Sequence, residues 1–126
     1  MNRGALPEVA RVLLAGVRLV NGAASLFAPA TFARKLGVDP ETNGPAIYVL
    51  RMFGVRTILI GSELLSRNPE VRAHAVRHAI RVHLTDAIAA AAAGATRQLP
   101  AKGAKLAVLT SSVNTALAVI ARRAIR

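Results

Sequence analysis

The residues of this chain that could do chemistry are a few charged and amide side chains set inside long apolar stretches. Arg18, Arg56 and Asp86 lie near the middles of three such stretches. A charge at the centre of a membrane costs roughly 2.5–3.5 kcal/mol on insertion scales, so it is expected to be paired. We therefore expect Asp86 to pair with Arg56, with Arg18 or with both, while Asn21 and Asn114 complete the hydrogen bonds.

Two interpretations of this polar layer stay open. Buried ion pairs often do no more than fix the register of the helices that carry them. The same groups could also form a polar pocket for a proton, an anion or a polar head group. A second ion pair, Arg11 with Glu63, is predicted nearer the cytoplasmic face.

Other kinds of chemistry have little support in the sequence. The chain has no cysteine, which excludes disulfides, thiol nucleophiles and zinc or iron–sulfur sites built on thiolates. His74 and His78 are four residues apart, but a zinc site needs three or four ligands, and Glu70 is the nearest carboxylate. Glycine loops for phosphate and Ser/His/Asp sets are not visible. We predict no metal, no cofactor, no catalytic residue and no enzymatic activity.

The polar residues must be positioned by four apolar segments, at residues 9–28, 46–65, 75–95 and 106–121. Each is close to the ~20 residues that a helix needs to cross a membrane. Prolines at positions 29, 45, 69 and 100 separate the segments, and Asn68 and Pro69 have the types of an N-cap and a first helical residue. A short amphipathic piece is expected at residues 31–36. Since alternating apolar and polar runs are missing, we predict helices throughout.

Composition favours an apolar environment for these helices. The chain has 126 residues, of which 53% are hydrophobic and 18% charged, and its mean hydropathy is +0.42. A single domain of this length cannot easily bury that many apolar residues, so the surplus needs contact with lipid. The net charge of +11 suggests nucleic acid, but the basic residues are spread over the chain without an aromatic stacking platform, so we predict no nucleic acid.

The spacing of polar residues supports the same conclusion for most of the chain. Arg11, Arg18, Gly22 and Ser25 form a narrow polar stripe on an otherwise apolar helix, which suits a membrane bundle with a polar interior. Glycines 16, 22, 54 and 61 and the alanine run 87–93 allow helices to approach closely. Segment 75–95 is closer to a water-facing helix, and a basic surface of Arg72, Arg77 and Arg81 is predicted to bind anionic lipid head groups.

The distribution of basic residues predicts the orientation of such a bundle. With four spans, both termini lie on one side, and that side is richer in Lys and Arg, as the cytoplasmic side of a membrane protein usually is. We predict an all-α, four-helix transmembrane bundle, one domain over residues 1–126, with cytoplasmic N- and C-termini. The side of the termini holds Arg3, Arg11, Arg67, Arg72, Arg77, Arg122, Arg123 and Arg126. The other side holds Arg34, Lys35, Arg97, Lys102 and Lys105.

Three strings of the sequence also carry a resemblance. They are "FAPATFARKLGVDPET", "YVLRMFGVRTILIG" and "LTDAIAAAAAG". In this order they resemble small four-helix membrane proteins of unknown function that are common in actinobacteria and DoxX-like in general layout. In such proteins an acidic residue often follows "RMFGVR", where this chain has Thr57. The resemblance implies an integral membrane protein without an established activity.

Three hypotheses about function follow. The first is a multi-pass protein of the cell (inner) membrane that acts as a structural or accessory component, as a homo-oligomer or within a larger complex. The second is a membrane carrier or redox helper that uses the Arg/Asp pocket. The third is a soluble basic helical bundle that binds anionic surfaces.

Overall fold

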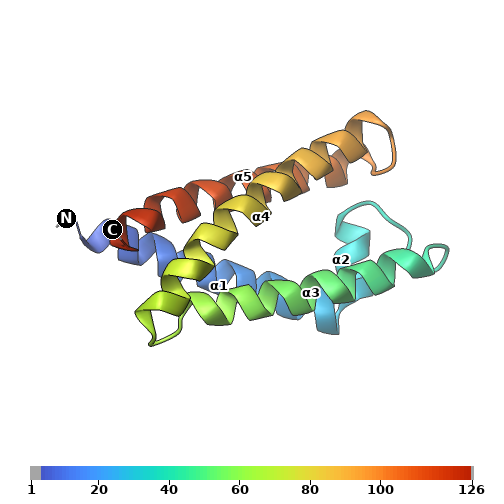
Figure 1. The fold of residues 1–126 in the computed structure, drawn as a ribbon. Coiled ribbons are helices and arrows are strands. Elements are labelled where there is room, and N and C mark those ends of the chain that lie inside the picture. The colour runs from blue at the N-terminus through green and yellow to red at the C-terminus, as the bar shows by residue number, and fades with distance from the viewer. Residues whose placement is uncertain (1–3, 126) are drawn as a thin grey trace.

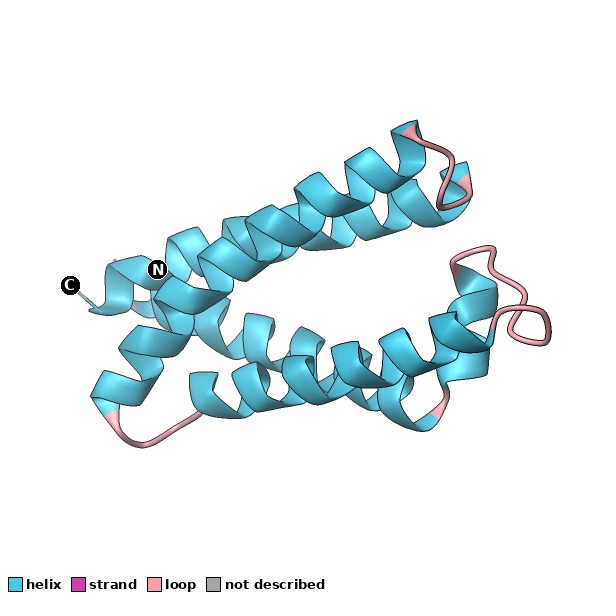
Figure 2. Ribbon diagram, turned by 45° about the vertical axis from the view of Figure 1, so that its right-hand side comes forward, coloured by secondary structure: helices cyan, strands magenta, loops and turns pink. Residues whose placement is uncertain are grey.

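The computed structural model describes residues 4–125, and within them the chain is helical with short connections and no strand (Figures 1 and 2). The all-helix prediction is confirmed for this part of the chain. The helices are α1 (Ala5–Phe27), α2 (Pro29–Lys35), α3 (Gly44–Leu64), α4 (Pro69–Ala95), α5 (Ala101–Ala121) and the terminal 3-10 turn η1 (Arg122–Ile125).

The predicted N-cap and first residue of α4 are confirmed. The side chain of Asn68 accepts a hydrogen bond from the backbone N–H of Glu70 at 2.9 Å, and Pro69 is the first residue of α4. Asn43 caps α3 in the same way, accepting from the N–H of Ala46 at 3.1 Å. These caps satisfy backbone donors that have no partner within the helix.

The four long helices alternate in direction, so that both ends of the chain lie at one end of the bundle (Figure 1). Helices α1 and α3 form one packed pair, and α4 and α5 form a second, hairpin-like pair. The two pairs converge near the termini and diverge toward the other end (Figure 2). At that end, the residues that follow α2 contact the second pair, since Gly103 of α5 packs against the backbone of Leu36.

The pairing of α1 with α3 depends on two glycines. A Cβ atom on Gly54 would lie 2.8 Å from the carbonyl oxygen of Gly22 and 2.8 Å from the backbone nitrogen of Leu26. Contacts this short do not occur, so only glycine lets the two backbones approach this closely. Gly16, in contrast, has open space where its Cβ would be.

The apolar core lies at the end of the bundle where the termini are. It is small and rich in alanine, and its largest fully buried members are Leu14, Leu64 and Val76. Many large apolar side chains point outward instead. Those that are at least half exposed are Val12, Leu13, Val20, Phe27, Tyr48, Val49, Met52, Leu59, Leu84, Ile88, Leu109 and Val113.

Three helices are long and apolar enough to cross a membrane: Ala5–Phe27, Gly44–Leu64 and Ala101–Ile125. By length and composition, three of the four predicted spans therefore meet this criterion, and α4 does not. Helix α4 is the exception because its first half carries Glu70, Arg72, Arg77 and Arg81, which lower its hydropathy. The predicted segments also start two to six residues later than the helices; in α4 and α5 the missed first turns carry charged residues.

Candidate functional site

A buried arginine lies at the centre of the bundle. The side chain of Arg18 is on α1, its residue is 1% exposed, and it contacts His83 of α4, which is 4% exposed. One guanidinium nitrogen, Nη1, donates toward Nε2 of the His83 ring and lies 3.3 Å from Nδ1. A guanidinium can only donate, so the imidazole nitrogen that faces it must be an acceptor, and His83 is neutral in this contact.

The guanidinium has two further nitrogens. Among the described residues, Nε and Nη2 of Arg18 have no hydrogen-bond acceptor, and the oxygens Thr57 Oγ1 and Asn114 Oδ1 have no hydrogen-bond partner either. Leaving buried polar groups unpaired is costly, and more so for a charged group. These atoms are therefore the part of the bundle best suited to receive something further.

An internal cavity of about 40 Å³ lies among these groups. All four long helices contribute to its wall, and most of the side chains can donate a hydrogen bond. They are Arg18, Asn21, Phe53, Thr57, His83, Asp86, Thr110, Ser111 and Asn114. The structure thus brings together four of the five residues that the sequence predicted for the polar layer, namely Arg18, Asn21, Asp86 and Asn114.

The fifth residue, Arg56, lies beside the cavity and holds Asp86. Its Nη2 donates to both carboxylate oxygens, at 3.1 and 3.2 Å. The sequence left open whether Asp86 pairs with Arg56, with Arg18 or with both. In the structure Asp86 pairs with Arg56, and Arg18 hydrogen-bonds to His83 instead. The Arg56–Asp86 pair lies at the outer edge of the layer, with side chains 47% and 27% exposed. Neither Asn21 nor Asn114 hydrogen-bonds to this pair among residues 4–125.

The second predicted ion pair does not form in the structure. Arg11 pairs with Glu8 at 2.6 Å, one turn earlier in α1, and also donates to the backbone carbonyl of Leu64. Side chains three residues apart on a helix meet without any tertiary contact, which gives Glu8 the advantage over Glu63. Glu63 is exposed on α3.

The predicted basic surface on α4 is smaller than expected. Arg77 and Arg81 are exposed, but Arg72 is half-buried and donates to the carbonyls of Ser66 and Arg67, at 2.9 and 3.1 Å. Arg72 thus holds the loop between α3 and α4, and is less free to reach a lipid head group. The rings of His74 and His78 stack with centroids 5.8 Å apart.

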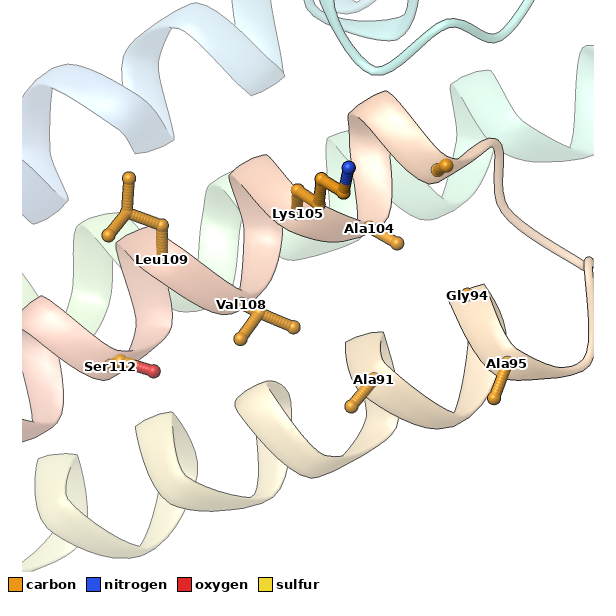
Figure 3. A pocket seen from close by; sticks show the side chains of 9 residues that line it. Ala91, Gly94, Ala95, Ala104, Lys105, Val108, Leu109 and Ser112 are labelled. Atoms are coloured by element: carbon orange, nitrogen blue, oxygen red, sulfur yellow. The ribbon is translucent and has the colours of Figure 1, made fainter.

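Two grooves flank α4 on the outside of the bundle. One, of about 580 Å³, runs between α3 and α4, with Met52, Val55, Leu59 and Ile60 along its wall and Arg56, Glu63, His74 and His78 around it. The other, of about 560 Å³, lies where the α4–α5 hairpin closes (Figure 3). Small residues line much of it: Ala91, Gly94 and Ala95 from α4, and Ala101 and Ala104 from α5, with Val108 and Leu109 further along.

His83 and Thr57 are the site residues that the sequence analysis missed. His83 precedes Asp86 by three residues and so shares its side of α4. That spacing was the available signal.

Comparisons with protein-family models, with curated proteins and with solved structures found no match to this chain.

Proposed function

We propose that the chain is a multi-pass protein of the cell (inner) membrane, with all four long helices inserted and both termini cytoplasmic. The observation that carries the proposal is the distribution of polarity in the bundle. Arg18, Thr57, His83 and Asn114 are buried, whereas large apolar side chains cover the outside. Water would favour the opposite arrangement, and lipid favours this one.

Helix α4 is the span that needs a separate argument. Beyond Arg81, its only charged residue is Asp86, which is paired with Arg56. The opposite side of this half of α4 exposes Leu84 and Ile88. At 27 residues the helix is about 40 Å long, so roughly its first 10 Å, with Glu70 and Arg72, extends beyond a ~30 Å hydrocarbon core. Arg77 and Arg81 lie on the next turns, from which long arginine side chains reach back to the interface. Inserted beside its neighbours, α4 exposes Leu84 and Ile88 to lipid, while the charge of Asp86 is neutralised by Arg56.

Within the membrane, we propose a structural or accessory role in an assembly, with another protein or as a homo-oligomer. Two features support it: the grooves on either side of α4, and the small residues that line the groove at the hairpin end. Small residues allow a neighbouring helix to approach closely, which is how helices commonly associate in lipid.

Fractionation of cells that express the full chain tests membrane insertion. We expect the protein to stay in the membrane pellet through washes with high salt and then with alkaline carbonate. Release by salt alone would show attachment through the +11 charge, and would favour a basic bundle on anionic surfaces. Release by carbonate would equally contradict four inserted helices.

The assembly is tested by filling the hairpin groove. Ala95→Leu places a large side chain in it, and the matched control Ala89→Leu adds the same side chain to an exposed position of α4 outside the groove. In native gels of membranes solubilised in mild detergent, we expect a complex larger than the monomer that Ala95→Leu reduces and Ala89→Leu preserves. A monomer for the wild-type chain would contradict the proposed role.

A further inference from the structure

The cavity beside Arg18 has the composition of an anion site. Its wall carries the guanidinium of Arg18, the hydroxyl groups of Thr57, Thr110 and Ser111, and amide groups. Its one carboxylate, Asp86, is already bound by Arg56 through both oxygens. The interior therefore offers hydrogen-bond donors around a cation.

The charges of the layer do not balance. Arg18 and Arg56 contribute two positive charges and Asp86 one negative charge, while His83 is neutral because it accepts from Arg18. The remaining charge is +1, and it belongs to a guanidinium that is 1% exposed and has two nitrogens without partners in the described residues. A buried charge without a counter-ion is strongly unfavourable, so a monovalent anion would stabilise this arrangement.

The size of the cavity selects among anions. Its volume of about 40 Å³ is near that of one water molecule in the liquid, roughly 30 Å³. A single halide ion fits such a space, whereas phosphate, a lipid head group or a nucleotide is too large. We propose that this cavity is a binding site for one chloride-sized halide ion, beside the guanidinium of Arg18 and the side chain of Thr57.

Rotation of one amide completes the proposed site. Asn114 Oδ1 has no donor among the described residues. Turning the amide group by half a rotation puts its NH₂ in the place of the oxygen and adds another hydrogen-bond donor next to the cavity. The halide site uses only residues inside the bundle, whereas the proposed assembly uses the outer grooves, so either one can fail without the other.

Halide binding is measured on the purified full chain in detergent micelles, with chloride as the probe. Chloride-35 NMR line broadening is followed as chloride replaces gluconate at constant ionic strength. We expect broadening that bromide displaces and phosphate does not. Thr57→Val, which removes one donor at nearly constant volume, should weaken binding about tenfold. Arg18→Gln should abolish it, and Arg51→Gln, which removes an exposed arginine of α3, should leave it unchanged.

Each outcome of this titration decides the proposal. If Arg18→Gln does not fold, Thr57→Val remains the deciding variant, because it alters no charge. Broadening that does not saturate, that Thr57→Val leaves unchanged or that Arg51→Gln reduces equally would overturn the site. Displacement by phosphate as effective as that by bromide would overturn the size argument and with it the proposed halide.

Discussion

At the scale of single residues, the contact of Arg18 with His83 is the least expected feature of the bundle. His83→Ala removes the only protein partner of Arg18 among the described residues and leaves a third guanidinium nitrogen unpaired. We expect a loss of stability of about 1–3 kcal/mol. Thermal unfolding in detergent, followed by circular dichroism, measures it.

Two further variants show whether the stability loss comes from the Arg18–His83 contact or from any substitution in α4. His83→Gln keeps an acceptor near Arg18 and should recover part of the lost stability. His78→Ala changes an exposed histidine of the same helix and should have little effect. Equal losses for His78→Ala and His83→Ala would contradict the role given to the buried contact.

The polar layer shows how far sequence reasoning reaches at this scale. The positions of Arg18, Asp86 and Asn114 within their segments predicted a common depth, and the structure places all three around one cavity. Depth does not determine the direction in which a side chain points around its helix axis. For that reason the partner of Arg18 was not among those expected, and Arg11 found Glu8, a local partner, in place of Glu63.

At the scale of elements, the close approach of α1 and α3 gives a sharp prediction. Gly54→Ala places a methyl group 2.8 Å from backbone atoms of α1, which cannot move aside as a flexible side chain would. Overpacking of this kind typically costs about 1–3 kcal/mol. We expect a lower unfolding temperature in detergent for Gly54→Ala. Gly16→Ala, which meets nothing within 4 Å, should be neutral or slightly stabilising.

The glycines also show what sequence determines about elements and what it does not. Small residues predicted close approach of helices without saying which helices meet. Gly22 and Gly54 do lie at a crossing, whereas Gly16 faces open space, because only the tertiary arrangement decides which face of a helix is covered. Caps and prolines depend on local geometry, and for that reason the start of α4 at Pro69 was predictable.

At the scale of the whole molecule, the composition predicted the inverted distribution of polarity correctly. A chain with 53% hydrophobic residues and mean hydropathy +0.42 leaves large apolar side chains outside, and the structure shows them on all four long helices. The number of spans was harder to predict, because α4 combines a basic first half with an alanine-rich second half. The hydropathy of α4 alone does not make it a candidate span, and its proposed insertion would depend on the side chains that α3 and α1 supply as partners.

The side of the membrane on which residue 98 lies therefore distinguishes four spans from three. The chain has no cysteine, so Glu41→Cys, Glu70→Cys and Gln98→Cys each introduce a single thiol at an exposed position near a helix end. With four spans, residues 41 and 98 face the outside and residue 70 the cytoplasm. In spheroplasts, a membrane-impermeant maleimide should label the first two and reach residue 70 only after permeabilisation.

A bundle in which α4 stays at the cytoplasmic surface gives a different pattern. Residue 98 would then be protected together with residue 70, and the last helix would carry the C-terminus outward, away from the side that the basic residues favour. Labelling all three variants in detergent provides the control for thiol reactivity. Protection of Gln98→Cys in spheroplasts would reduce the bundle to three spans. Asp86 would then lie outside the membrane, and its pairing with Arg56 could not be explained by burial of both charges in lipid.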